Sequence, residues 1–357
     1  MMKIEFSKMY VDDDIRSSVI DVLNSGIYIK GERLRSFERE FAEFCGTRYS
    51  FGVSSGTSAI LLALMALGIK KGDEVIVPAH TFVATASPAI FLGGTPVFAD
   101  IEEDTYTIDP EDMARKITER TKAIIPVHLY GHPCDMDPIN DIAQEKGIAV
   151  IEDACQAHGA VYRGKKAGSI GDIGCFSFFP SKNMTVLGEG GMVSTDNEEL
   201  AEKISMLRDH GRRDKYVHEV LGLNLRMDEI HAAIGRESLK HISDWNRRRR
   251  EIASLYHRLL QGLDLVAPVE KSWAEHVYHL YVIRIKEREK LAAYLNKKGV
   301  STGVHYPVPL HRQPCMLADV HLPVTERCAK EILSLPMHPQ LLDEEVEYVC
   351  DEIREAL

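Results

Sequence analysis

Short runs of apolar residues alternate with amphipathic stretches through the first half of the chain. Four runs have the length and composition of buried strands, and the three stretches between them carry the spacing of helices. The expected strands are Glu74–Val77, Pro96–Ala99, Ala123–Val127 and Ile148–Ile151, and the expected helices lie near 81–92, 110–119 and 136–146. This alternation is typical of an α/β domain, with a mostly parallel central sheet flanked by helices.

Two helices are expected before this region. The first follows three aspartates at 12–14, which suit the positive end of a helix, and it stops at Gly26. Its apolar face is formed by Ile15, Val19, Val22 and Leu23. The second opens at the segment 54–57, runs through the apolar residues 59–67 and closes at Gly68.

The pattern changes in the second half of the chain. Short strands joined by a glycine-rich loop are expected from Cys175 to Thr195, and a further strand at 275–285. Helical spacing returns near 197–209, 227–260, 287–298 and 343–356. We therefore expect a large domain over residues 1–245 and a smaller C-terminal α+β domain over 246–357.

Composition narrows the class of protein. The 357 residues carry a net charge of −11, which argues against nucleic acid as a partner. The basic run Arg247–Arg250 is the local exception, and we interpret it as a solvated helix face. Seven cysteines without a CxxC pair indicate neither disulfides nor zinc. No apolar run approaches the ~20 residues of a membrane span, and Met1–Ser7 lacks the pattern of a signal peptide, so we expect a cytoplasmic protein without membrane contact.

Three stretches carry candidate chemistry, and each has an ordinary structural explanation. The strand ending in Glu152 and Asp153 places an acid where α/β sheets bind ligands, although Asp153 is equally suited to cap a helix. Lys182 follows an aromatic–proline corner and precedes glycines at 188, 190 and 191; taken alone, it is a surface lysine. The helix start at Ser54–Ser58 suits a phosphate group, or simple capping.

Together the three stretches fit the chemistry of pyridoxal 5′-phosphate (PLP). Such an enzyme needs a phosphate cradle, an acid facing the pyridine nitrogen and a lysine that forms a Schiff base. The order cradle, acid, lysine resembles the fold-type I PLP-dependent transferases. More specifically, the chain resembles the DegT-type family of sugar-nucleotide aminotransferases over about 260 residues. The resembling segments are SSGTSA (54–59), PAHTFVAT (78–85), VHLYG (127–131), EDACQAHGA (152–160), FSFFPSKNMTVLGEGGM (176–192), GLNLRMDEIHAAIG (222–235) and GVHYPVPLHRQP (303–314).

The resemblance implies a role for each matching residue. Lys182 carries the cofactor and moves the proton between the substrate α-carbon and the cofactor C4′, while Asp153 pairs with the pyridinium nitrogen. The other implied cofactor contacts are Gln156 at O3′, Phe82 on the ring, Thr57, Ser58 and Ser177 at the phosphate, and Asn224 supplied by the neighbouring subunit of a homodimer. Phe82 also suits a plain core position, and Ser177 a polar strand face. The implied acceptor pocket contains His305, Tyr306, His311, Arg312 and Gln313.

The implied reaction transfers an amino group from an L-amino acid, expected to be glutamate, to a nucleotide-linked keto sugar. The segment 303–313 favours C3 over C4 as the site of amination. Two departures from the family pattern concern the substrate pocket: Glu189 stands where aspartate is common, and His132 where glutamine is frequent. Lys182 argues against the dehydratase branch, in which histidine replaces the lysine.

Two alternatives remain from the sequence. One is a non-catalytic regulator with the same fold, against which the Lys182–Asp153 pair speaks. The other is a PLP aminotransferase acting on a cyclitol ketone, because the fold and cofactor site would be the same. The fifteen histidines show no HExxH motif and no pairing with cysteine, so we expect no metal site.

Overall fold

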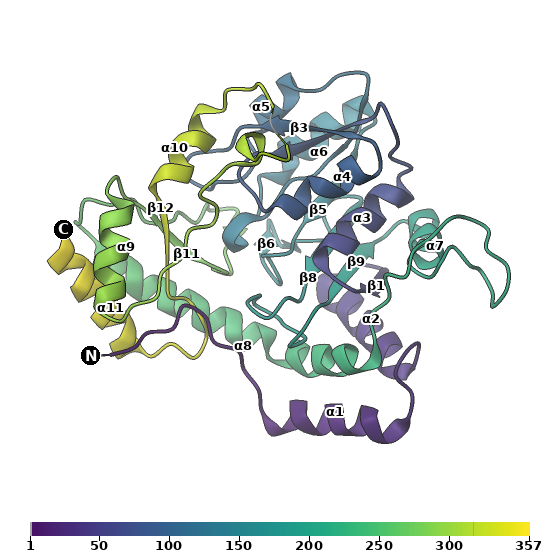
Figure 1. Cartoon of the computed structure of the whole chain (residues 1–357), viewed down its shortest axis with the longest axis horizontal. Helices are drawn as coiled ribbons and strands as arrows, with labels where there is room; N and C mark the ends of the chain where they lie inside the picture. The colour runs from purple at the N-terminus through teal and green to yellow at the C-terminus, as the bar shows by residue number, and fades with distance from the viewer. Residues whose placement is uncertain (1, 317) are drawn as a thin grey trace.

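The computed structural model describes residues 2–316 and 318–357, and a seven-stranded sheet forms its centre (Figure 1). The strands lie in the order β1-β9-β8-β5-β4-β2-β3. The four adjacent pairs between β8 and β3 are parallel, whereas β9 runs antiparallel to both β8 and β1. The strands are β1 (Tyr49–Val53), β2 (Glu74–Pro78), β3 (Thr95–Ala99), β4 (Thr121–Ile124), β5 (Ala149–Asp153), β8 (Ile173–Ser177) and β9 (Gly191–Thr195). The mostly parallel α/β sheet predicted from the sequence is thus confirmed.

Helices cover this sheet, and their burial explains their composition. The helix α3 (Gly56–Ala66) is apolar on almost every side because it packs between β8, β9 and the helix α7 (Glu198–Leu207). On another part of the sheet, α6 (Met136–Lys146) packs against β5 through Met136, Ile139 and Ala143. The remaining helices of this layer are α1 (Asp13–Ser25), α2 (Glu32–Cys45), α4 (Ser87–Phe91) and α5 (Pro110–Arg115).

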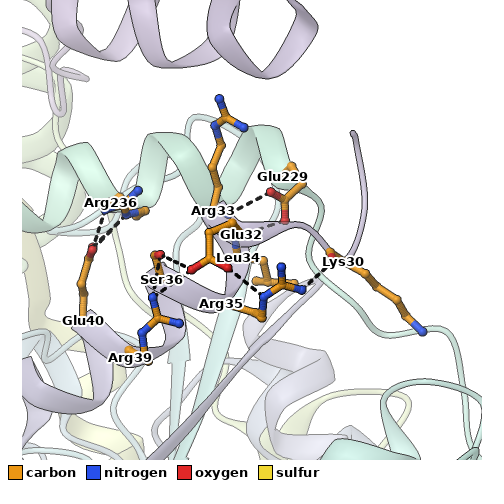
Figure 2. Close-up of polar contacts among 10 residues, drawn as sticks. All are labelled: Lys30, Glu32, Arg33, Leu34, Arg35, Ser36, Arg39, Glu40, Glu229 and Arg236. Carbon is orange, nitrogen blue, oxygen red and sulfur yellow. Dashed lines mark hydrogen bonds and ion pairs between the residues drawn. The ribbon is translucent and has the colours of Figure 1, made fainter. Parts of the chain in front are cut away.

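The start of α2 is held by a carboxylate from a distant part of the chain. Glu229 accepts hydrogen bonds from the backbone N–H groups of Gly31, Arg33 and Leu34 at 2.8, 3.0 and 3.1 Å. Figure 2 shows Glu229 beside Arg33 and Leu34 at the start of α2. The close approach requires a glycine at position 31, because a Cβ atom there would lie 2.4 Å from the Glu229 carboxylate. Glu229 thus satisfies N–H groups that have no partner within α2.

The seven-stranded sheet and its helices form one layer, and a second, smaller layer contains the C-terminal part of the chain. The long helix α8 (Glu229–Leu260) runs past both (Figure 1). Here β11 (Tyr281–Arg284) pairs antiparallel with β12 (Ile332–Leu335), and α9 (Arg288–Lys297), α10 (Pro323–Glu331) and α11 (Asp343–Ala356) lie nearby. Its core includes Ile4, so the N-terminal segment packs in this layer with the C-terminal helix. The predicted boundary between residues 245 and 246 falls inside α8, and the division into 1–245 and 246–357 stays a prediction.

Most expected elements lie where the pattern placed them, with three differences. Helical structure near 81–92 is divided into η1 (Val83–Thr85) and α4, because Pro88 starts a new helix rather than continuing one. The strand at 275–285 is divided into β10 (Ala274–Glu275) and β11, and Tyr278 between them has a φ of +43° that a strand does not permit. The structure adds α2, β1, α10, β12 and a small sheet in which β6 (Val161–Tyr162) pairs with β7 (Lys165–Lys166) and β10.

The basic run in α8 differs from the solvated face that we expected. Arg247 is exposed, but Arg249 is buried and donates to the carbonyl oxygens of Tyr278, His279 and Met337 at 3.1–3.2 Å. The run therefore joins α8 to the smaller layer rather than facing water throughout. Within the described residues, no helix has the length and apolar composition to cross a membrane.

Candidate active site

A cavity of about 360 Å³ lies at the carboxyl ends of β5 and β8. This position is where α/β sheets bind their ligands. Seven of the residues singled out from the sequence line it: Thr57, Phe82, Asp153, Gln156, Ser177, Lys182 and Tyr306. They come from segments up to about 250 positions apart (57 to 306), so the fold gathers them at one site.

Asp153, the last residue of β5, is buried and its carboxylate is oriented by two donors. The Thr85 hydroxyl donates to Oδ2 at 2.8 Å, and the backbone N–H of Cys155 donates to Oδ1 at 3.2 Å. Thr85 is in turn hydrogen-bonded to the Thr81 hydroxyl at 2.9 Å. The carboxylate therefore has a fixed position at the wall of the cavity.

Glu152 lies on the opposite side of the same strand, as the alternation of β-structure requires. Its carboxylate accepts from His128 Nε2 at 2.8 Å and from the N–H groups of Gly168, Ile170 and Gly171 at 2.6–2.8 Å. Burial alone would raise the pKa of Glu152, but these hydrogen bonds outweigh it and hold the pKa below its ordinary value. Glu152 is thus fully engaged in the fold and does not line the cavity.

Lys182 lies in the loop between β8 and β9. Its backbone N–H donates to the carbonyl of Phe179 at 2.9 Å, which forms a tight turn. Burial lowers the pKa of its ammonium, and the carboxylate of Asp153 opposes this only in part. Among the described residues, no acceptor hydrogen-bonds the Lys182 ammonium. A lysine with a lowered pKa and a free amine is suited to nucleophilic attack on a carbonyl.

The start of α3 forms another wall of the cavity. Ser55 caps the helix by accepting from the Ser58 N–H at 3.1 Å, and the Ser58 hydroxyl is bonded to those of Ser54 and Ser55 at 2.8 and 2.9 Å. A Cβ atom at Gly56 would lie 2.7 Å from that of Ser177, so glycine allows the helix to meet β8 closely. Thr57 and Ser177 line the cavity, whereas Ser58 is buried behind it.

Gln156 connects the cavity to the smaller layer. Its Oε1 accepts from the backbone N–H of Tyr130 at 2.8 Å, and its Nε2 donates to the Tyr306 hydroxyl at 3.2 Å. The Tyr306 ring lies 5.8 Å from the half-exposed ring of Phe82. These contacts place two aromatic rings at the mouth of the cavity.

Comparison with known proteins agrees with this geometry. Residues 9–354 match the DegT/DnrJ/EryC1/StrS aminotransferase family. The chain is 42% identical to dTDP-3-amino-3,4,6-trideoxy-alpha-D-glucose transaminase of Streptomyces venezuelae, over 99% of this chain and 94% of that protein. It is 44% identical to UDP-N-acetyl-3-dehydro-alpha-D-glucosamine 3-aminotransferase of Acidithiobacillus ferrooxidans, over 97% and 94%. The crystal structure of S. venezuelae DesV with a ketimine intermediate superposes with a TM-score of 0.96 at 41% identity, covering 99% and 98% of the chains.

The chain belongs to the DegT/DnrJ/EryC1/StrS aminotransferase family. It is therefore an enzyme whose cofactor is PLP, as predicted, and the regulator alternative is set aside. The cavity fits this cofactor, because it combines an amine without a hydrogen-bond acceptor, an oriented carboxylate and a helix start that presents the Thr57 hydroxyl. As in other PLP enzymes, these are the three groups that the cofactor requires.

Five other predicted residues of this aminotransferase lie outside the cavity lining. Asn224 is exposed beside Asp209 in the segment between α7 and α8. His305 directs Nδ1 to the Ser334 hydroxyl at 2.9 Å and stacks on Phe6. The buried His311 and the exposed Arg312 both contact the Glu326 carboxylate, at 3.0 and 2.8 Å, and Gln313 donates to the carbonyl of Val308 at 3.2 Å.

Sequence reasoning gave no role to three polar residues that surround Asp153, namely Thr81, Thr85 and Cys155. Glu189 also lines the cavity. Thr81 and Thr85 belong to the segment 78–85 that carries the family resemblance, but their hydroxyls become relevant only when this segment packs on β5. The departure at Glu189, which we expected to concern the substrate pocket, thus lies in the lining of the cavity.

Proposed function

We propose that this aminotransferase moves an amino group from glutamate to C3 of a nucleotide-linked keto sugar. Both relatives named above are described as acting on a nucleotide sugar at position 3, and together with the family match they support the sugar and the position. The observation that carries the proposal is the placement of Lys182, Asp153 and the start of α3 around one cavity. An aminotransferase acting on a cyclitol ketone would need the same cofactor cavity, so only the identity of the acceptor distinguishes the two functions.

In this proposal Lys182 and Asp153 have distinct roles. Lys182 binds the cofactor covalently through Nζ, and the same nitrogen carries the proton to and from the substrate carbon. Asp153 keeps the pyridine nitrogen protonated, with Thr85 holding the carboxylate in place. PLP, when bound, accepts the electron pair that remains when Lys182 removes the proton from the substrate carbon.

The remaining proposed cofactor contacts follow the walls of the cavity. Thr57 and Ser177, with the N–H groups at the start of α3, bind the phosphate. Ser58 does not line the cavity; its hydroxyl is hydrogen-bonded to those of Ser54 and Ser55 and so holds the start of the helix in place. Phe82 covers one face of the ring, and Gln156 lies at O3′.

Tyr306 is the proposed acceptor residue with the most direct support, since its hydroxyl is held at the cavity by Gln156. The roles of His305, His311, Arg312 and Gln313 stay predictions. The Arg312 guanidinium shares Glu326 with His311 and is half exposed, which suits a contact with a diphosphate. A diphosphate there would have to compete with Glu326.

We also propose a homodimer in which Asn224 serves the partner's site. The segment between α7 and α8 projects from the molecule (Figure 1) and exposes apolar side chains, of which Leu221 is 96% and Tyr216 79% exposed. Exposed apolar groups in such number favour a protein interface. Mixing Lys182→Ala subunits with Asn224→Ala subunits should restore activity in some heterodimers. If mixed dimers form and stay inactive, each site is built from one chain.

The central assignment is tested by reduction with borohydride and peptide mapping. The label is expected on Lys182, and Lys182→Ala is expected to lose the visible absorbance of the bound cofactor and nearly all turnover. A label on another lysine contradicts the assignment. A panel of C3 and C4 keto sugars on dTDP and UDP, together with a cyclitol ketone, then identifies the acceptor by the mass of the amino product.

A further inference from the structure

The residue after Lys182 belongs to a buried network of amides that the proposed catalytic roles do not use. Asn183 donates through Nδ2 to the carbonyl of Val277 and to Oδ1 of Asn246, both at 3.0 Å. Asn246, on α8, donates through its own Nδ2 to the carbonyl of His158 at 2.7 Å. His279 Nδ1 lies 3.1 Å from Asn183 Oδ1. All of these side chains are at least 90% buried.

The backbone carbonyls fix the direction of every hydrogen bond in this network. The carbonyls of Val277 and His158 only accept, so the side-chain atoms that face them are the NH₂ groups of Asn183 and Asn246. Oδ1 of Asn183 must then accept from His279. The proton of His279 is therefore on Nδ1, which leaves a lone pair on Nε2.

This network holds the lysine loop from two sides. Asn246 ties it to α8, while Val277 and His279 tie it to the segment that leads into β11 of the smaller layer. Within the described residues, Nε2 of His279 makes no hydrogen bond. Burial keeps the pKa of His279 well below its ordinary value, and the Lys182 charge lowers it further, so the ring next to the lysine is neutral.

From this geometry we infer that Asn183, Asn246 and His279 are positioning residues for Lys182. The network fixes the backbone next to Lys182 and keeps a neutral imidazole, of one tautomer, hydrogen-bonded to the residue that follows the lysine. The inference rests on the proposed role of Lys182 and adds to it the residues that set the lysine's environment. Each acts through the loop, and none is required to touch the substrate.

The test measures the lysine rather than turnover alone. In Asn183→Ala and Asn246→Ala the loop loosens and the ammonium becomes better hydrated, so the pKa of Lys182 in the cofactor-free protein should rise by about one unit. The pH dependence of Lys182 labelling by an amine reagent in the cofactor-free protein, read by mass spectrometry, measures this pKa. In the holoenzyme the pH midpoint of the visible band reports the same nitrogen in its bond to the cofactor, and it should move in the same direction. kcat should fall more than KM changes.

Three variants separate positioning from a loss of stability. Asn140→Ala removes another amide-to-carbonyl bond, to Ile170, at a distance from the loop; it should leave both midpoints unchanged. His279→Asn keeps a donor at the place of Nδ1, so both pH midpoints should stay close to those of the wild type. His279→Leu removes the donor, and its midpoints should shift as in Asn183→Ala.

Unchanged midpoints in both Asn183→Ala and Asn246→Ala would overturn the inference. If borohydride instead marks a lysine other than Lys182, the proposed function fails. In that case the labelling of Lys182 in the cofactor-free protein still decides whether the network controls its pKa.

Discussion

Asp153 and Glu152 are adjacent, buried and acidic, yet their surroundings give them different chemistry. Glu152 has four donors and no access to the cavity, so it stabilises the fold. Asp153 has two donors and lines the cavity, so it has a remaining acceptor site for a ligand. The distinction follows from which face of β5 each side chain occupies.

Replacement of Asp153 by asparagine should preserve the fold and remove the charge. Without that charge the pyridine nitrogen is not kept protonated, and kcat should fall roughly 1,000-fold. Thr85→Val is the matched control, because it removes one hydrogen bond and keeps the carboxylate; its loss should stay below about tenfold. Steady-state kinetics and the thermal midpoint of both variants check this. An Asp153→Asn enzyme within threefold of the wild type would place the acid elsewhere.

The site residues with a family motif could be predicted from the sequence, and seven of them meet in one cavity. The Asn183–Asn246–His279 network could not, because its members lie up to 96 positions apart and carry no periodicity. Their significance depends on how α8 crosses the lysine loop, which local spacing does not contain.

At the scale of elements, the sequence of α2 has the apolar spacing of a helix, which our sequence analysis did not include. Leu34, Phe37 and Phe41 have helical spacing and are buried, so the pattern alone could have predicted this helix. Its N-terminus could not have been predicted, since Gly31 offers no capping side chain and the cap comes from Glu229, about 200 positions away. Similarly, the break at Tyr278 depends on tertiary contacts rather than on β-propensity.

Glu229→Ala should therefore destabilise the protein substantially. Two buried N–H groups and a partly buried one lose a charged acceptor, which is worth about 3 kcal/mol in the free energy of unfolding. Glu32→Ala is the control within the same helix: its pairs with Arg35 and Arg39 are exposed (Figure 2), and little change is expected. Urea unfolding followed by tryptophan fluorescence compares the two. Equal midpoints for both variants would contradict the capping role.

At the scale of the whole molecule, burial holds several histidines neutral. It lowers the pKa of His80 and His132 to about 4, that of His158 to about 3, and, together with the Lys182 charge, that of His305 to about 4. In the unfolded chain these groups titrate near 6.5. The unfolded chain therefore binds more protons below pH 6.5, and stability must fall as the pH falls toward 4.

We accordingly expect the urea midpoint to be constant between pH 7 and pH 8 and to drop between pH 6.5 and 4.5, before the carboxylates titrate. His158→Phe should weaken this dependence, because its ring lies between Phe176 and Phe178 with both nitrogens unpaired in the described structure. Unfolding curves at half-unit intervals of pH measure it. A midpoint that stays the same at pH 5 and pH 7 would show that the rings are hydrated in the folded protein.

The helix α8 has a further consequence for how the sequence can change. It contributes Glu229 to α2, Asn246 to the lysine loop and Arg249 to the smaller layer, all from one uninterrupted helix. A residue inserted between positions 235 and 245 would turn everything beyond it by about 100° about the helix axis. Asn246 and Arg249 would then face away from their partners together. Surface loops of this enzyme can therefore gain or lose residues, whereas the length of α8 is fixed by helical phase.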